Sequence, residues 1–219
     1  MSNPFVYLGV DIAGADNTWV AGLARMEGGL MMALPPGQMT LEEIVAFCQR
    51  EQVLAVGIDG QLSMATSDER GFRDPDFELR ALLPAPNRNW VASFNSLMAV
   101  PMRSMLLAER LAPDVGTLLE VHPRASLWFA LGADRPVAVR HYKKHPDAPA
   151  HIATLWAGWA ERFAIQGAAP TSDGGLDALV CATLAFLYHQ QPESLLHLRH
   201  PAAHKSGFGP FYVLRPDLL

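Results

Sequence analysis

Two aspartates close apolar runs in the same way and are the first candidates for chemistry. Residues 5–11 read Phe-Val-Tyr-Leu-Gly-Val-Asp and residues 53–59 read Val-Leu-Ala-Val-Gly-Ile-Asp, so Asp11 and Asp59 each end a Gly-x-Asp pattern. Short apolar runs of this kind indicate buried strands. A carboxylate at the end of a buried strand needs a partner, because an unpaired buried charge is unfavourable. Each aspartate therefore either forms an Asx-turn or binds a metal ion or a phosphate.

A third aspartate stands directly before a stretch without charge. Residues 178–187 contain no charged side chain, which predicts a final helix buried on nearly all sides, and Asp177 lies at its start. Asp173, four residues earlier, suits a helix N-cap. For Asp177 the alternatives are a favourable interaction with the helix dipole and a role as a ligand.

Basic residues gather in one place, residues 135–145. This stretch holds Arg135, Arg140, Lys143 and Lys144 and no acidic residue. It is either a solvated loop or a phosphate-binding loop. Residues 67–80 carry both signs of charge and are expected to form a solvated loop and a short helix.

Composition favours an ordinary globular protein, which we expect to form a single domain over residues 1–219. Half of the 219 residues are hydrophobic, and a net charge of −5 gives no global attraction to nucleic acid or membrane. Cys48 and Cys181 lie in apolar helical patterns and are expected to be buried thiols in a reducing compartment. The run that ends at Asp11 has no basic region before it, and no apolar run approaches the ~20 residues of a membrane span. We therefore expect a cytoplasmic protein with no membrane contact.

Apolar spacing predicts the elements that position the candidate residues. Between the runs that end at Asp11 and Asp59, strands are expected over residues 18–26 and 30–34, with a hairpin turn between them. The Pro-Pro-Gly sequence at residues 35–37 is expected to break the sheet. Thr40 and Glu43 then form a capping box at the start of a helix.

The second half of the chain is predicted to be mainly helical. Helices are expected over residues 101–111, 124–131 and 147–167 and from Asp177 onward, with strands over residues 117–122 and 210–214. Trp156 and Trp159 belong to the apolar stripe of the long helix and are expected in the core. Glu120 and His122 are two residues apart on a strand and so share one face.

This order of elements resembles the ribonuclease H-like fold, in which one carboxylate ends the first strand, one ends the fourth and one opens the last helix. The Asp-Ala-Leu-Val-x-Ala run at Asp177 resembles the last helix of Holliday-junction resolvases of the RuvC type. Nearly the whole chain resembles the DUF429 family, described as predicted nucleases of this fold. The matching pieces are Gly9-Val10-Asp11, Gly57-Ile58-Asp59 with Leu62, Arg73-Asp74 with Arg80, Glu120-Val121-His122-Pro123, Tyr142-Lys143-Lys144, Asp177-Ala178-Leu179 and residues 209–216. The resemblance implies an α/β fold with a mixed five-stranded sheet flanked by helices, in which the first three strands are antiparallel and strands 1, 4 and 5 are parallel.

The resemblance also implies an acidic site for hydrolysis. In such a fold the first and fourth strands are parallel neighbours, so Asp11 and Asp59 meet and Asp177 faces them. Like charges this close require a cation, and Mg²⁺ or Mn²⁺ takes carboxylate oxygens. Two ions roughly 4 Å apart can activate a water molecule and stabilise the leaving oxygen of a phosphodiester. We therefore expect a metal-dependent nuclease or phosphodiester hydrolase that acts on nucleic acid or another phosphodiester.

Further residues receive roles on the same basis. Lys144 is expected to stabilise phosphate charge, and Lys143, Arg140 and Arg73 are expected to bind the substrate. Glu120 is expected to be a fourth ligand if the fifth strand lies beside the fourth, and otherwise a structural hydrogen-bond acceptor.

Two alternatives come from other classes of protein. A catalytically silent binding or scaffold protein of the same fold agrees with the net charge of −5, because proteins that bind duplexes usually carry a basic face. The Gly-x-Asp strand followed by a glycine turn also resembles the first phosphate motif of actin-like ATPases and sugar kinases. Finally, His197, His200 and His204 have a metal-like spacing, but Pro201 interrupts any helix that would carry them.

Overall fold

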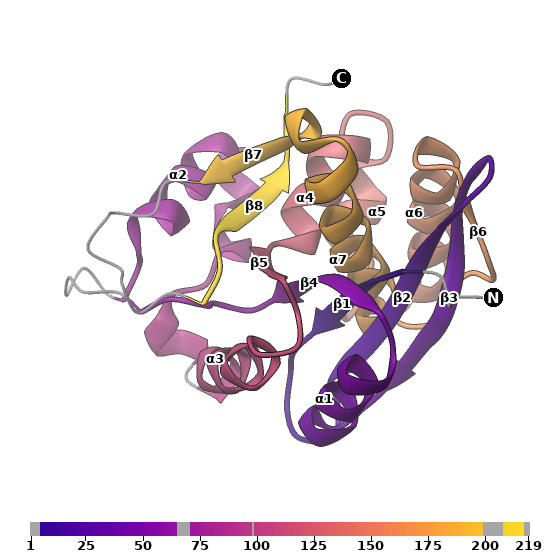
Figure 1. Cartoon of the computed structure of the whole chain (residues 1–219). Coiled ribbons are helices and arrows are strands. Elements are labelled where there is room, and N and C mark those ends of the chain that lie inside the picture. The colour runs from indigo at the N-terminus through magenta and orange to yellow at the C-terminus, as the bar shows by residue number, and fades with distance from the viewer. Residues whose placement is uncertain (1–4, 65–70, 98, 199–207, 217–219) are drawn as a thin grey trace.

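The protein is built on one mixed β-sheet. The computed structural model describes residues 5–64, 71–97, 99–198 and 208–216 (Figure 1). Eight strands form the sheet in the order β6-β3-β2-β1-β4-β5-β8-β7. Their bounds are β1 (Val6–Asp11), β2 (Trp19–Met26), β3 (Gly29–Gln38), β4 (Val53–Asp59), β5 (Thr117–Val121), β6 (Ile165–Gln166), β7 (Leu195–Leu198) and β8 (Phe211–Leu214).

Strand pairing is antiparallel at one side of the sheet and parallel at its centre. β1 pairs antiparallel with β2, and β2 with β3, while β4 lies parallel to both β1 and β5. β8 extends the parallel part beside β5, and β7 pairs antiparallel with β8 at the edge. The expected α/β class with a mixed sheet is confirmed, but the sheet of the described residues has eight strands rather than five. Of the three additional strands, β8 was expected over residues 210–214, whereas β6 and β7, two and four residues long, are too short for a clear alternation of apolar and polar residues.

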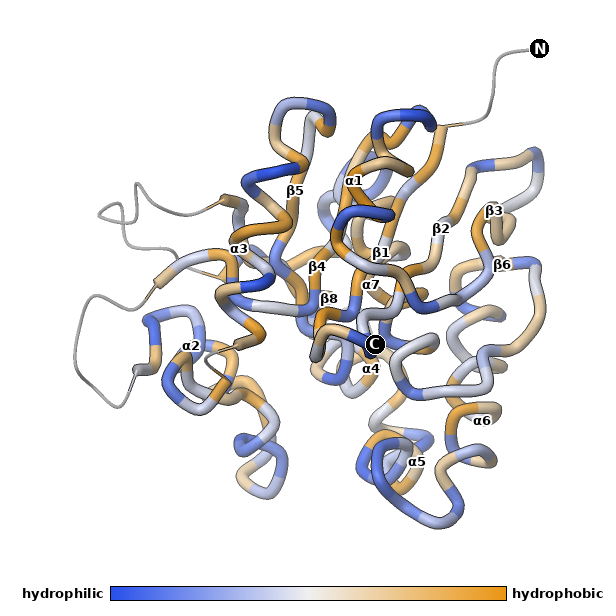
Figure 2. Tube along the Cα trace, turned by 90° about the horizontal axis from the view of Figure 1, so that it is seen from below, coloured by the Kyte–Doolittle hydropathy of each residue, from blue (hydrophilic) through white to orange (hydrophobic). Residues whose placement is uncertain are grey.

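Helices cover both faces of the sheet (Figure 1). Side chains of α1 and α3 pack with β1 and β4 on one face, and those of α4 to α7 pack on the other. In Figure 2 the hydrophobic segments concentrate in the central strands and the hydrophilic ones in the outer turns. The α-helices are α1 (Leu41–Arg50), α2 (Asp74–Leu82), α3 (Ala99–Leu111), α4 (Pro123–Leu131), α5 (Pro136–His141), α6 (Ala148–Arg162) and α7 (Asp173–Gln190), and the 3₁₀ helices are η1 (Ala85–Trp90), η2 (Phe94–Leu97) and η3 (Pro192–Ser194).

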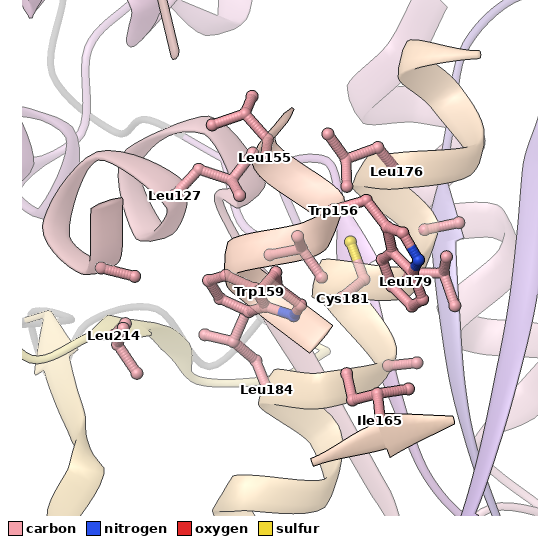
Figure 3. Packing of buried hydrophobic residues seen from close by; sticks show 14 of the residues in the cluster. Leu127, Leu155, Trp156, Trp159, Ile165, Leu176, Leu179, Cys181, Leu184 and Leu214 are labelled. Atoms are coloured by element: carbon pink, nitrogen blue, oxygen red, sulfur yellow. The ribbon is translucent and has the colours of Figure 1, made fainter. Parts of the chain in front are cut away.

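Several local predictions are confirmed. Thr40 and Glu43 form the capping box of α1, and both cysteines are buried free thiols. Trp156 and Trp159 pack in the core between α6 and α7 (Figure 3). No described helix combines the length and the apolar character that a membrane crossing requires.

The third strand was predicted to end too early. Residues 35–37 do not break the sheet, because β3 continues to Gln38, which pairs with Trp19 of β2. The register between β2 and β3 shifts near Gly22, and β6 pairs only with Leu30 and Met31 of β3. The prolines therefore lie where one side of β3 has no neighbouring strand among the described residues, and edge positions tolerate the missing N–H groups.

Two further predictions are corrected. Part of the basic cluster is not a loop, because residues 136–141 form α5. Ser172, not Asp173, is the N-cap of α7, since its side chain accepts a hydrogen bond from the backbone N–H of Gly175. Residues 67–70 of the mixed-charge stretch lie outside the described residues, as do His200 and His204.

The Gly-x-Asp pattern has a packing reason. A Cβ atom on Gly9 would lie 1.9 Å from the carbonyl oxygen of Ala178, and one on Gly57 would lie 2.4 Å from that of Cys181, so α7 rests directly on the backbones of β1 and β4. Asp11 and Asp59 follow these glycines by two residues and so lie on the same face of the sheet. Four residues of helix rise about 6 Å, close to the length of two strand residues. Asp177 lies one helical turn before Cys181 and is therefore placed beside Asp11 and Asp59.

Candidate functional site

The three aspartates predicted from the sequence come together. Asp11 and Asp59 are direct partners at the carboxyl ends of β1 and β4, and Asp177 reaches them from the second turn of α7. One carboxylate oxygen of each residue lies within 4.8 Å of the other two. Asp177 is fully buried, whereas Asp11 and Asp59 are partly exposed. The site thus opens to solvent along the ends of the two strands and is closed by the helix.

Burial and mutual repulsion raise the pKa values of this group. The pKa of Asp11 lies well above its usual range, because the carboxyl is buried and lies near the charges of Asp177 and Asp59. Burial raises the pKa of Asp59 to about 7, against the opposing effect of Lys143. Burial also raises the pKa of Asp177, although Lys143 and Tyr142 lower it in part. A cation would relieve the repulsion and favour the ionised carboxylates.

This electrostatic arrangement predicts how stability depends on pH. In the unfolded chain an aspartate has a pKa of about 3.9. Between about pH 4 and pH 7 the folded protein therefore binds more protons at Asp59 than the unfolded chain does, since the folded pKa is about 7. The contribution of Asp59 to the free energy of unfolding must then fall as the pH rises through this range.

We expect Asp59→Asn to gain stability relative to the wild type between pH 4 and pH 7 when divalent ions are absent. His122 acts in the opposite sense, because burial lowers its pKa to about 4 and its contribution rises with pH. Because both proteins contain His122, its contribution cancels when the stability of the variant is compared with that of the wild type. Denaturant unfolding of both proteins at several pH values measures the difference, and a difference that is constant with pH would contradict the raised pKa of Asp59.

Tyr142 and Lys143 hold Asp177 from the segment that follows α5. The hydroxyl of Tyr142 donates to Asp177 Oδ1 over 2.8 Å, and Lys143 Nζ lies 2.5 Å from Asp177 Oδ2. Tyr142 is fully buried, while the Lys143 side chain keeps 30% of its surface exposed. Because Lys143 supplies the counter-charge of a buried carboxylate, it belongs to the site itself rather than to its rim.

Lys144 differs from Lys143 in its exposure. Its side chain is exposed on the border of the pocket, and its backbone φ of 55° is in the left-handed region. Such a conformation is unfavourable for a residue with a Cβ atom and persists only where the surroundings impose it. Lys144 was expected to stabilise phosphate charge, and that role stays a prediction, whereas the contact with Asp177 belongs to Lys143.

Glu120 is not placed as a ligand of the acidic group. β5 does lie beside β4, but Asp59 is in register with Val121, so Glu120 lies on the opposite face of the sheet. Its Oε2 accepts hydrogen bonds from the backbone N–H of Leu62 and from Arg73 Nη1, both over 2.8 Å. Arg73 Nη2 lies 2.5 Å from Oε1. The structural role considered for Glu120 is therefore the one that its contacts support.

The contacts of Arg73 also differ from the predicted role in substrate binding. Arg73 is 2% exposed, and its guanidinium also donates to both carboxylate oxygens of Asp76 and to the hydroxyl of Ser63. Burial alone would lower its pKa, but the charges and hydrogen bonds of Glu120 and Asp76 raise it above its usual range. Arg73 thus joins α2 to β5, and although it lines the pocket, its guanidinium is bound within the protein.

A pocket of about 760 Å³ opens beside the acidic group. Asp11 and Asp59 line it, and Arg140, Lys143 and Lys144 contribute basic side chains. Arg140 is exposed, as expected for a residue that binds substrate, and the structure places it at this pocket. The pocket therefore offers carboxylates and cationic groups within one volume.

Sequence reasoning missed other members of the pocket. Arg124 lies with its guanidinium carbon 4.2 Å from the ring centroid of Trp90, and both residues line the pocket. His122 also lines it and accepts a hydrogen bond from the backbone N–H of Ala125 as the N-cap of α4. Tyr142 was part of a matched motif, but nothing in its neighbours along the chain indicated its bond to Asp177. These residues are far from the aspartates in sequence, and only the fold brings them near.

Comparison with known proteins gave no match: no family model, no curated protein and no solved structure matches this chain. The resemblance to the DUF429 family therefore stays a prediction. The function is therefore inferred from the geometry of the site and the chemistry of its residues.

Proposed function

We propose that this chain is a metal-dependent phosphodiester hydrolase, with Asp11, Asp59 and Asp177 as the ligands of Mg²⁺ or Mn²⁺. The observation that carries the proposal is the meeting of three carboxylates from β1, β4 and α7 beside a pocket with basic side chains. The order β3-β2-β1-β4-β5, with its antiparallel and parallel pairings, supports a ribonuclease H-like fold and a relation to the DUF429 family as parts of the same proposal.

The donor set fits a hard divalent ion. All three side chains offer carboxylate oxygens, which Mg²⁺ and Mn²⁺ prefer. In an octahedral shell with bonds of ~2.1 Å, oxygens lie ~3 Å apart when adjacent and ~4.2 Å apart when opposite. The separation of at most 4.8 Å requires only a small closure of the carboxylates. When bound, such an ion supplies Lewis acidity toward a phosphoryl oxygen and an acidified water molecule.

The basic residues of the pocket account for substrate binding. Lys143 pairs with Asp177 and lines the pocket, so its ammonium would be free for a phosphate oxygen when Asp177 holds an ion. Arg140 offers a planar guanidinium that suits two phosphate oxygens. Pocket volumes of ~300–1,000 Å³ are typical for small ligands. We therefore propose a substrate whose phosphodiester enters the pocket, such as a small diester or one nucleotide unit of a single strand.

A cleavage assay tests this function. We expect the wild type to hydrolyse bis(4-nitrophenyl) phosphate or labelled single-stranded oligonucleotides with Mn²⁺ and to lose this activity with a chelator. Replacing a residue that only supports a metal ligand typically lowers activity about 10- to 100-fold. Because Asp59 is proposed as a ligand itself, Asp59→Asn should lower the rate of cleavage more than ~100-fold. Asp134→Asn, which changes an exposed aspartate outside the site, is the matched control. No metal-dependent cleavage in the wild type, or full activity in Asp59→Asn, would contradict the proposal.

One observation favours a second candidate function. Lys143 already supplies a cation to Asp177, and the raised pKa values of Asp11 and Asp59 favour their protonated forms, so the site can persist without any metal ion, as in a binding or scaffold protein that does not hydrolyse its ligand. In that case the pocket would bind a phosphate-containing ligand equally well with and without divalent ions. Affinity that is unaffected by a chelator, together with absent cleavage, would favour this function. Nothing among the described residues favours the ATP-dependent phosphotransferase.

A further inference from the structure

Three histidines form a cluster of their own, outside the aspartate group. His141 is the last residue of α5, His145 follows it in the connection, and His151 lies in the first turn of α6. Their ring centroids are 4.9 Å apart for His141 and His145, 5.7 Å for His145 and His151, and 6.2 Å for His141 and His151. All three side chains are at least partly exposed, so an ion can reach them from solvent.

These separations agree with a tetrahedral metal site. At a metal–nitrogen distance of ~2.0–2.1 Å, an imidazole centroid lies ~3.2 Å from the ion, and two rings at the tetrahedral angle have centroids ~5.3 Å apart. The measured separations lie on both sides of this value. We propose that His141, His145 and His151 bind a transition-metal ion with imidazole preference, such as Zn²⁺, and that water supplies the fourth ligand.

Binding requires rotation of the rings. In the structure the ring nitrogens of the three histidines do not all lie within 4.8 Å of one another. Among the described residues, only the three aspartates bring ligand atoms that close together. A half-turn about the bond between Cβ and Cγ exchanges the two edges of an imidazole and leaves its centroid nearly in place. Exposed rings make this turn readily, so the centroid separations are the appropriate measure of the site.

Asp147 gives the cluster a second independent feature. A histidine that binds a metal through one nitrogen usually donates the hydrogen on its other nitrogen to a carboxylate or a carbonyl. His145 Nδ1 lies 3.8 Å from Asp147 Oδ2 and 3.2 Å from the backbone nitrogen of Asp147, which donates to it. If His145 binds the ion through Nε2, its hydrogen moves to Nδ1, which then gives up the hydrogen bond from the backbone N–H of Asp147 and can donate to the Asp147 carboxylate once the two approach from 3.8 Å.

The two proposed sites select different ions and are joined by one segment. Carboxylate oxygens prefer Mg²⁺ or Mn²⁺, whereas imidazoles prefer Zn²⁺ and its neighbours. His141 and His145 flank Tyr142 and Lys143, the two residues that contact Asp177. An ion at the histidines would therefore fix the segment that supplies Lys143 to the acidic group. The histidine site itself does not depend on the function proposed for the aspartates.

Titration of Zn²⁺ or Co²⁺ into tag-free protein tests this site, with Mg²⁺ in excess throughout. We expect one Zn²⁺ per chain by calorimetry, a higher melting temperature with Zn²⁺, and the strong visible absorption of tetrahedral Co²⁺. His141→Ala and His151→Ala should each remove the Co²⁺ absorption. Asp147→Asn should weaken binding about 10- to 100-fold, as expected for a residue that supports a ligand.

His189→Ala is the matched control, because it removes a histidine outside the cluster and should leave Zn²⁺ binding unchanged. Melting without metal shows that each variant is folded, and the two single histidine variants provide independent tests. Absence of Zn²⁺ binding in the wild type would overturn the proposal. Binding that survives both His141→Ala and His151→Ala would overturn it as well. Asp59→Asn should retain the Zn²⁺ site, which separates this proposal from the one for the aspartates.

Discussion

Arg73→Met is expected to lower the free energy of unfolding by about 3–5 kcal/mol, the cost of leaving a buried charge without its partner. Methionine retains much of the side-chain volume but none of the donors. Glu120 and Asp76 would keep their carboxylates, 2% and 1% exposed, without the guanidinium that pairs with both. Denaturant unfolding near neutral pH measures the change.

Two matched variants sharpen the comparison. Arg140→Met makes the same substitution at an exposed residue of the pocket and should change stability by no more than ~0.5 kcal/mol. Adding Glu120→Gln to Arg73→Met should recover part of the lost stability, because the variant no longer buries the unpaired charge of Glu120. Wild-type stability in Arg73→Met, combined with weak substrate binding, would restore the sequence-based assignment of Arg73 as a substrate ligand.

Gly9→Ala is expected to destabilise the protein by about 3 kcal/mol or more, at or above the upper end for an overpacked core. The new Cβ would lie 1.9 Å from the carbonyl oxygen of Ala178 and 2.3 Å from the backbone nitrogen of Ala182. Both are backbone atoms of α7, so no side-chain rotation relieves the clash and the helix has to move away from β1. The same movement would separate Asp177 from Asp11.

Gly116→Ala is the control for this prediction. A Cβ at Gly116 would meet nothing within 4 Å. The substitution should therefore change stability by less than ~1 kcal/mol, with a small gain expected from the lower entropy of the unfolded chain. If thermal or denaturant unfolding finds Gly9→Ala as stable as Gly116→Ala, the close packing of α7 on β1 is wrong.

The aspartates could be found from the sequence because their signal is local. The apolar runs before Asp11 and Asp59 indicate strands, and the repeated Gly-x-Asp pattern indicates that two strands end alike. The absence of charge after Asp177 indicates a buried helix that carries this carboxylate into the interior. The resemblance to the ribonuclease H-like fold, in which the first and fourth strands are parallel neighbours, then led to the prediction that the three residues meet.

The roles of the other charged residues depend on contacts that no local pattern encodes. The ion pair of Arg73 with Glu120 joins residues 47 positions apart, and the two sequence neighbourhoods contain no sign of it. Lys143 rather than Lys144 contacts Asp177, and the sequence does not distinguish between these two adjacent lysines. The edge strands β6 and β7 are short and take their conformation from pairing. Tertiary context, rather than propensity, decides all of these.

Calorimetric titration of Mg²⁺ into the metal-free protein at about pH 8, above the folded pKa of Asp59, is the most direct test of the central claim. Mg²⁺ is the appropriate probe because it has little affinity for imidazole. The account predicts saturable binding to the wild type that releases protons, tighter binding to Lys143→Met because a competing cation is removed, and no binding to Asp59→Asn. If neither the wild type nor Lys143→Met binds Mg²⁺, or if Asp59→Asn binds it as well as the wild type does, the three aspartates are not a metal site.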